Sequence, residues 1–258
     1  MGKKDKSKEN KKGFRLFGKK RANRKDKKKN ERPEICLSLS CTNIESLKEQ
    51  IEEYKDCCQI VEWCVDSTLG SDDYTQEEFK TVLTEIKKLC KGKKLIVDYK
   101  GNEEVGNRIQ RWAMGIADII DIDADNSRLK EMVKEAKRKR TKTLISYHVF
   151  DRMPSRDEIA TQFVKMERNG GDILKIACFA SKESESYEIL EAACSYTQLA
   201  NHKPIVAIAM GEEGQASRIC AGDFGSVITY ACGSTPTAPG QFNARDLSRY
   251  LDIYYERR

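Results

Sequence analysis

Apolar and polar residues follow two different periods along this chain, and the two periods alternate with great regularity. Short apolar runs rich in β-branched residues recur eight times, and they predict strands over residues 35–40, 59–65, 94–99, 118–122, 143–147, 172–177, 204–209 and 226–231. Stretches rich in Glu and Lys with apolar residues at helical spacing lie between them, and they predict helices over residues 44–55, 76–89, 103–114, 127–139, 156–168, 183–200, 216–221 and 244–255.

This alternation predicts an α/β protein with a parallel sheet. Eight strand–helix units in about 225 residues match a (β/α)8 barrel, the TIM barrel, in number and length. An open doubly wound sheet is the alternative, but no glycine-rich segment follows the first strand, where residues 40–44 read Ser-Cys-Thr-Asn-Ile. We therefore predict a barrel domain over residues 34–258, preceded by a separate segment over residues 1–33.

Charge separates these two segments clearly. The 258 residues carry a net charge of +6, but residues 1–32 contain 16 basic and 4 acidic residues, which leaves the remainder at −6. Such a basic segment with few apolar residues is predicted to be disordered. It is either a solvated tail or a docking segment for RNA or an anionic surface, with residues 14–17 as a small apolar anchor. The acidic remainder excludes a uniformly basic nucleic-acid-binding domain.

Several other classes of protein and site are disfavoured by what the sequence lacks. No run approaches the ~20 apolar residues of a membrane span, and no apolar signal segment begins the chain, so we expect a cytoplasmic protein. The ten cysteines are scattered without a CxxC pair, and only two histidines are present. We therefore expect reduced thiols, with neither a disulfide framework nor a metal site.

Candidate chemistry is sought at the carboxyl ends of the strands, where TIM barrels carry their active sites. Polar residues expected there are Glu62, Asp66, Lys100, Glu104, Asp121, Asp123, His148, Lys175, Arg218, Thr237 and Gln241. Lys175 lies inside the apolar run Asp-Ile-Leu-Lys-Ile-Ala, where a charge is costly unless it is paired. The side chain is either a buried ion-pair partner or a neutral amine that attacks a carbonyl group.

His148 favours the second interpretation of Lys175. It ends the neighbouring predicted strand, so both side chains are expected to reach one ligand. A histidine beside an imine-forming lysine is suited to move a proton on the carbon next to the iminium group. Glu104 either orients His148 or is an ordinary acid in the first turn of a helix. We assign His202 no role.

With these residues in view, the chain resembles the type I 3-dehydroquinate dehydratases, the Schiff-base class of the shikimate pathway. The resemblance runs from about residue 35 to the C-terminus and rests on five motifs in the same order. These are Glu62-Trp63 with Asp66, Ser146-Tyr147-His148, the lysine strand 171–177, the segment 210–218 that contains Arg218, and the loop segment 237–241.

The resemblance implies a mechanism and a site. Lys175 would form an imine with the ketone of 3-dehydroquinate, His148 would act as general acid and base, and Glu104 would orient His148. The substrate-binding residues would be Ser38, Glu62, Cys64, Lys100, Arg218, Thr237 and Gln241. Arg218 would bind the substrate carboxylate, and Gly233 and Gly240 would be hinges of a loop that closes over the site. The family implies a homodimer, with no metal and no organic cofactor.

The sequence departs from the family at two of these positions. The second-strand motif of the family normally reads Glu-Trp-Arg, whereas here it ends in Cys64, and the arginine that normally ends the third strand is Lys100 here. Arg to Lys keeps the charge but loses the planar fork of donors. Three hypotheses remain: an ordinary dehydratase, a paralogue that uses the same chemistry on another ketone, or a weakly active binding protein that acts through its basic tail.

Overall fold

The structure is a computed structural model that describes residues 32–69 and 74–256. Most of the predicted basic tail therefore lies outside the described residues, and its predicted disorder and its boundary at residue 33 stay predictions. Arg32, the first described residue, forms an ion pair of 2.7 Å with Asp252 near the C-terminus. No helix within the described ranges is both long enough and apolar enough to cross a membrane.

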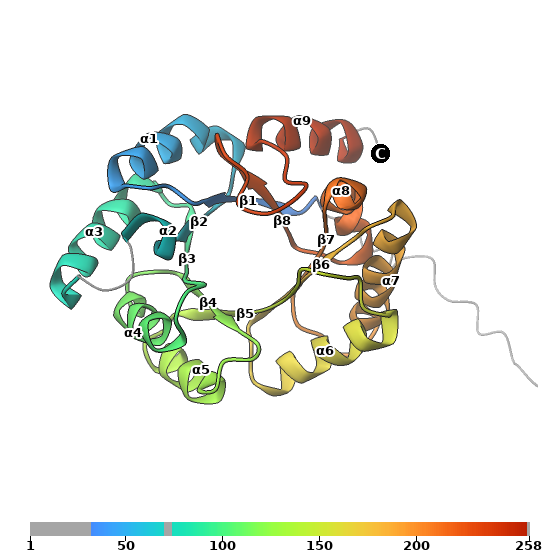
Figure 1. Cartoon of the computed structure of the whole chain (residues 1–258), viewed down its shortest axis with the longest axis horizontal. Helices are drawn as coiled ribbons and strands as arrows, with labels where there is room; N and C mark the ends of the chain where they lie inside the picture. Colours follow the sequence, from blue (N-terminus) through green and yellow to red (C-terminus); the bar gives the residue numbers. More distant parts are fainter. Residues whose placement is uncertain (1–31, 70–73, 257–258) are drawn as a thin grey trace, which may run out of the picture.

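Eight parallel strands surround a common axis, which confirms the predicted barrel (Figure 1). They are β1 (Glu34–Leu39), β2 (Ile60–Cys64), β3 (Lys94–Asp98), β4 (Ile119–Asp123), β5 (Lys142–Val149), β6 (Ile173–Phe179), β7 (Ile205–Met210) and β8 (Ile228–Cys232). Each strand pairs in sequence order from β1 to β7, and β8 returns to pair with β1. The remaining seam between β7 and β8 is joined at the bridge between Ile205 and Ser226, so the barrel is nearly closed.

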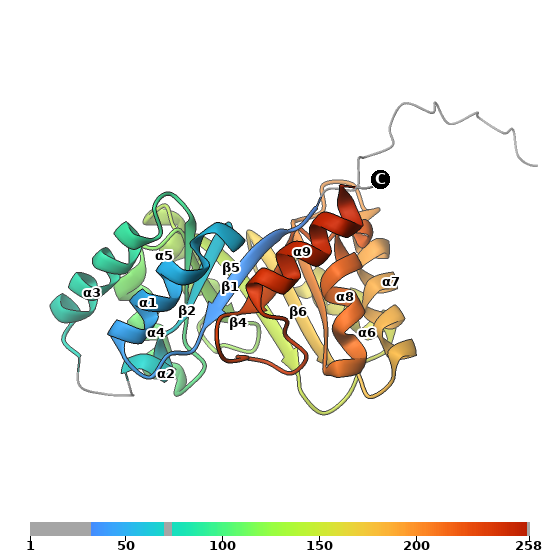
Figure 2. The same ribbon diagram turned by 90° about the horizontal axis from the view of Figure 1, so that it is seen from above.

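Helices form the outer layer around the strands (Figures 1 and 2). They are α1 (Ile44–Tyr54), α2 (Val65–Leu69), α3 (Gln76–Leu89), α4 (Glu103–Ala113), α5 (Leu129–Arg138), α6 (Arg156–Arg168), α7 (Ser186–Thr197), α8 (Gln215–Cys220) and α9 (Ala244–Tyr255). The helix predicted over 183–200 begins instead with a separate 3-10 turn, Glu183–Glu185. The short helix α2 directly after β2 was not predicted, because five residues are too few for a periodic signal.

The buried residues fall into two clusters, as the period-two alternation of strands requires. The larger one packs the outer faces of the strands against the helices, and it includes Trp63, Phe79 and Phe163. The smaller one lies inside the barrel and includes Ile60, Ile96 and Leu144. Because parallel strands in such a barrel are buried on both faces, their sequences read as nearly continuous apolar runs. The interior cluster closes the barrel beneath the site described next.

Candidate active site

Polar side chains replace apolar ones inside the barrel at a defined level. On five successive strands an apolar interior residue is followed two positions later, on the same face, by a polar one. The apolar residues are Cys36, Ile60, Ile96, Ile119 and Leu144, and the polar residues that follow them are Ser38, Glu62, Asp98, Asp121 and Ser146. Above this level, toward the carboxyl ends of the strands, a cavity of about 460 Å³ opens.

Lys175 on β6 is buried within this polar level, with 6% of its surface exposed. Its Nζ lies 3.6 Å from Glu62 Oε1 and 3.6 Å from Asp121 Oδ2, and it stands 4.0 Å above the ring centre of Tyr230. Burial alone would lower the pKa of Lys175, but the carboxylates of Glu62 and Asp121 outweigh burial and raise the pKa. The amine is therefore an ammonium ion held between two acids until a ligand or a proton transfer changes that balance.

His148 on β5 lines the same cavity as Lys175. Ser146 pairs in register with Lys175, so His148 projects from the same face two residues closer to the mouth. Burial, and then the charges of Lys175 and Lys100, lower the pKa of His148 to about 3. The exposed ring of Phe150 stacks on the imidazole with 5.7 Å between the ring centres. His148 is thus a neutral imidazole with a fixed ring plane, so a free ring nitrogen is available to accept a proton.

Lys100, just after β3, forms ion pairs with one acid on β3 and one on β4. Its Nζ lies 3.1 Å from Asp98 Oδ1 and 3.2 Å from Asp121 Oδ1, and it donates a hydrogen bond of 3.0 Å to Ser146 Oγ. Burial raises the pKa of Asp98 to about 7 against the attraction of Lys100, and the nearby Asp121 contributes to the rise. The positive charge of Lys100 is therefore largely neutralised within the protein, unlike that of a free anion-binding residue.

Arg218 on α8 is the opposite case, a buried cation without an acid. Only 1% of its surface is exposed, and no ion pair joins it to any residue in the described part of the chain. Its Nη2 donates to Pro239 O at 2.9 Å, while its Nε has no hydrogen-bond partner among the described residues. Burial lowers the pKa of Arg218 to about 10, which leaves it charged at neutral pH. Such a guanidinium is suited to bind a carboxylate.

The β8–α9 loop, residues 233–243, crosses the cavity and is tied to it by hydroxyl groups. Thr237 Oγ1 donates to Ser38 Oγ at 3.0 Å, and Ser38 Oγ donates to Glu62 Oε2 at 2.6 Å. Gln241 Oε1 accepts from Thr237 N at 2.7 Å. The loop therefore lies against β1 and β2 through a chain of hydrogen bonds that ends on a carboxylate beside Lys175.

The structure brings together all of the expected site residues except Glu104. The cavity lining includes Ser38, Glu62, Cys64, Lys100, His148, Lys175, Arg218, Thr237 and Gln241. Glu104 is exposed in the first turn of α4 and does not line this cavity. The carboxylate that bears on His148 is Asp121, which raises the pKa of the imidazole against the larger opposing effects. An orienting role for Glu104 therefore stays a prediction that this geometry does not support.

Asp98 and Tyr230 contact the lysines of the site but were not selected from the sequence. Asp98 lies two positions before Lys100, so alternation along β3 would have placed both on the interior face. Tyr230 lies in the apolar run Ile-Thr-Tyr-Ala-Cys of β8, where an aromatic residue is indistinguishable from ordinary core. Only the structure shows that its ring faces the ammonium of Lys175.

Comparisons with known proteins identify the family of this chain. The family model of type I 3-dehydroquinase matches residues 35–258. The chain belongs to the type I 3-dehydroquinase family. Among curated relatives, the 3-dehydroquinate dehydratase of Bacillus licheniformis is 30% identical over 238 residues, covering 87% of this chain and 93% of the relative. That of Clostridioides difficile is 27% identical over 239 residues, with the same two coverages.

Solved structures of the type I 3-dehydroquinase family share the barrel. The crystal structure of the Clostridium difficile type I enzyme with covalently modified comenic acid superposes with a TM-score of 0.81 at 26% identity, covering 88% of this chain and 94% of that one. A 3-dehydroquinate dehydratase from Geobacillus kaustophilus gives a TM-score of 0.78 at 22% identity, covering 87% and 91%. The resemblance inferred from the five motifs is thus confirmed at the level of family and fold.

Proposed function

We propose that this protein dehydrates 3-dehydroquinate to 3-dehydroshikimate through a Schiff base on Lys175. The observation that supports the proposal most directly is the shared cavity of Lys175, His148 and Arg218 in a member of this family. An amine, a neutral imidazole and an acid-free guanidinium supply a nucleophile, a base and a carboxylate site.

The reaction begins when Lys175 gives up its proton and attacks the ketone carbon. Glu62 Oε1 and Asp121 Oδ2, each 3.6 Å from Nζ, are the groups that can accept this proton. The carbinolamine that forms loses its hydroxyl group as water, which leaves an iminium ion. The substrate carboxylate is held by Arg218, which orients the ring with the ketone toward β6.

His148 then performs the elimination. Its neutral imidazole removes a proton from the carbon next to the iminium carbon, and the electron pair forms an enamine. The enamine re-forms the iminium while the β-hydroxyl group departs, and the imidazolium returns its proton to that hydroxyl, so that water leaves. Hydrolysis of the iminium releases 3-dehydroshikimate and restores the free amine of Lys175. Every proton taken up by His148 is returned, and the enzyme ends unchanged.

Reductive trapping tests this proposal. The full chain is incubated with 3-dehydroquinate and borohydride, which reduces an imine to a stable secondary amine. We expect a single adduct whose mass maps to Lys175, and no adduct in Lys175→Ala. Lys142→Ala, which removes an exposed lysine at the start of β5, is the control and should be labelled like the wild type. Absence of an adduct at saturating ligand in the wild type would overturn the proposal.

A second candidate, the same chemistry on a different ketone, is favoured by the state of β2 and β3. Cys64 is uncharged, and Lys100 is neutralised by Asp98 and Asp121. Removing a partner from a buried charged contact costs about 2–5 kcal/mol, up to a few thousandfold in specificity. Cys64→Arg tests this candidate: if the missing arginine alone limits recognition of 3-dehydroquinate, kcat/KM should rise at least about tenfold, or ~1.4 kcal/mol. An unchanged or lower value, with adduct formation by another ketone, would favour the paralogue.

A further inference from the structure

We infer that Tyr230 on β8 is a further catalytic residue, because the face of its ring contacts the Lys175 nitrogen and stabilises it as a cation. The Nζ atom of Lys175 stands 4.0 Å above the centre of the ring, which is the geometry of a cation–π contact. Only 2% of Tyr230 and 6% of Lys175 are exposed, and such contacts are strongest where water is excluded.

The ring reaches Lys175 across the barrel interior rather than from a neighbouring strand. Tyr230 pairs with Cys36 on β1, and β7 lies between β8 and β6 around the barrel. The side chain belongs to the apolar cluster inside the barrel, which also contains Ile208 of β7. Because protein interiors are closely packed, the ring has a fixed position beside the amine.

The two acids beside Lys175 are too distant for short hydrogen bonds to its ammonium group. Glu62 Oε1 and Asp121 Oδ2 are each 3.6 Å from Nζ. Charge-assisted hydrogen bonds between nitrogen and oxygen are normally about 2.7–2.9 Å long. The face of the Tyr230 ring is therefore a substantial part of what stabilises the charge at Nζ.

The acids and the ring differ in what they can do at the nitrogen. A carboxylate can take a proton from Nζ, whereas the face of an aromatic ring attracts positive charge and accepts no proton. The acids are therefore suited to remove a proton from Lys175, and the ring is suited to stabilise whichever cation the nitrogen forms.

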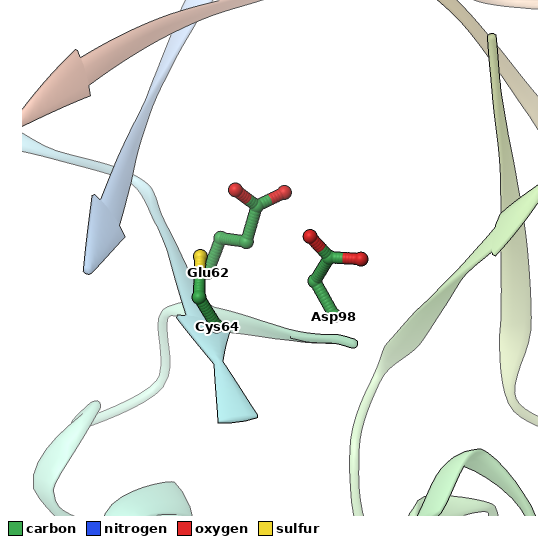
Figure 3. A group of neighbouring side chains, drawn as sticks. All are labelled: Glu62, Cys64 and Asp98. Atoms are coloured by element: carbon green, nitrogen blue, oxygen red, sulfur yellow. The ribbon is translucent and has the colours of Figure 1, made fainter. Parts of the chain in front are cut away.

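The hydroxyl group of Tyr230 is neutral and does not supply this stabilisation. Burial raises the pKa of the hydroxyl well above its usual range, and the charge of Glu62 adds to the rise. Figure 3 shows the Glu62 carboxylate extended from β2 into the barrel interior, where it faces Asp98. The ring, and not a phenolate charge, therefore acts on Lys175.

The contact has a consequence that rests on the proposed function, whereas the contact itself does not. When an ammonium ion and a ketone give an iminium ion and water, no proton is gained or lost overall, so the nitrogen is part of a cation before and after. The ammonium ion has three N–H donors, whereas the iminium ion keeps only one. A cation–π contact needs no N–H in a fixed direction, so the ring stabilises both ions.

The other titratable groups around Lys175 come from β1 to β5 and from the residue just after β3. They are Cys36, Glu62, Asp98, Lys100, Asp121 and His148. Burial lowers the pKa of Lys175, Glu62 and Asp121 raise it above its usual range, and Lys100 opposes them. All of these groups are the same in Tyr230→Phe and Tyr230→Leu, so a comparison of these two variants isolates the ring.

Reductive methylation tests the inference without any ketone substrate. The full chain is treated with formaldehyde and cyanoborohydride, which methylate neutral amines, and the rate at Lys175 is measured by peptide mass spectrometry at several pH values. Tyr230→Leu and Tyr230→Met lack the ring. They should shift the pH midpoint of labelling down by about one unit, and so raise the rate at neutral pH about tenfold. Tyr230→Phe keeps the ring and should stay within about twofold of the wild type.

Ile208→Ala is the matched control for access to Lys175. It enlarges the same cavity from β7 without removing a ring, so the pH midpoint of labelling should not move. Circular dichroism must show that each variant is folded, and two ring-free variants are used so that one folded variant suffices. The inference is refuted if a folded ring-free variant keeps the wild-type midpoint, or if Tyr230→Phe shifts the midpoint as far as the ring-free variants do.

This test can fail separately from the proposed dehydration. Absence of a borohydride adduct with 3-dehydroquinate in the wild type would overturn the proposed function and leave the methylation result intact. A wild-type adduct on Lys175, together with unshifted midpoints in the ring-free variants, would overturn only the assignment of Tyr230.

Discussion

At the scale of single residues, the site is defined by how its charges are paired. Lys175 and Lys100 are surrounded by carboxylates, whereas Arg218 is a buried cation with no ion pair among the described residues. In the proposed mechanism, this difference places the substrate carboxylate at Arg218 on α8 and the ketone at Lys175 on β6.

The protonation of His148 leads to a prediction about stability and pH. Its pKa is about 3 in the folded protein and about 6.5 in an unfolded chain, so only the unfolded state binds a proton between these values. The stability contributed by the neutral imidazole is therefore present above pH 6.5 and lost as the pH falls toward 3. Between pH 7 and pH 5 the loss amounts to up to about 2 kcal/mol.

Urea unfolding of the wild type and of His148→Gln at several pH values measures this term. We expect the free energy of unfolding of the wild type to fall more steeply below pH 6.5 than that of the variant, with equal m-values. Parallel pH curves for the two proteins would show that the imidazole does not resist protonation.

Residues of the site could be predicted from the sequence only where the residue type is unusual for its position. A lysine within an apolar strand and a histidine at the next strand end stand out in the sequence. Asp98 and Tyr230 do not, because an acid at a strand end and an aromatic residue in a core run are common. Glu104 was expected in the site because the family motif places an acid there, yet it is exposed in the first turn of α4 and does not line the cavity.

At the scale of elements, the β8–α9 loop combines a left-handed glycine with close backbone packing. Gly240 has φ +72°, and a Cβ added to it would lie 2.0 Å from Gly211 O. The loop carries Thr237 and Gln241, and its Pro239 O accepts a hydrogen bond from Arg218. A side chain at position 240 would therefore displace the loop from the site, since neither the backbone angle nor the space admits one.

Gly240→Ala is accordingly expected to lower kcat/KM for 3-dehydroquinate at least about tenfold, as strain of 1–3 kcal/mol opens the closed loop. Gly92→Ala is the matched control, because Gly92 also has a positive φ (+87°) but no atom within 4 Å of an added Cβ. The control should lose some stability and retain kcat/KM, as measured by product absorbance. If both variants lost kcat/KM equally, backbone strain alone would explain the loss, and the close contact with Gly211 would not contribute to it.

Helix ends provide a second test at this scale. Ser155 caps α6 in a reciprocal pair with Glu158, in which each side chain accepts from the other residue's backbone N–H. Ser155→Ala should lower the free energy of unfolding by about 1 kcal/mol. Ser195→Ala, an exposed position whose hydroxyl bonds only within α7, should change it by less than about 0.5 kcal/mol. Similar losses would mean that the cap contributes nothing beyond helix propensity.

Strand and helix positions were largely predictable because each element repeats one pattern. The predicted strands overlap all eight observed strands, since burial on both faces leaves uninterrupted apolar runs. Ends were less predictable: β5 continues to Val149 because it pairs with β6 as far as Cys178, a tertiary contact that no local pattern records. The seam between β7 and β8, joined through one bridge, likewise depends on the closure of the whole barrel.

At the scale of the whole molecule, charge is divided between the basic tail and the acidic barrel domain. Residues 34–258 carry −6, against +6 for the entire chain. All of the tail except Arg32 and Pro33 lies outside the described residues, so docking to RNA or an anionic surface stays a prediction, as do the cytoplasmic location and the homodimer.

Removing residues 1–33 should therefore abolish binding to anionic vesicles and to RNA while leaving turnover of 3-dehydroquinate unchanged. Binding of the full chain should weaken steeply with rising salt, because it depends on neutralised phosphates. Co-sedimentation at several salt concentrations measures it, with neutral vesicles as the control. Binding that is insensitive to salt, or that persists without the tail, would exclude electrostatic docking.

The apolar cluster inside the barrel has a kinetic consequence. The end of the barrel beneath Lys175 is filled by Ile60, Ile96 and Leu144. Substrate and product therefore share the mouth of the cavity beside residues 233–243. The water molecule expelled by elimination leaves by the route through which the next substrate arrives. A change in residues 233–243 that narrows this mouth should therefore slow substrate entry and product release together.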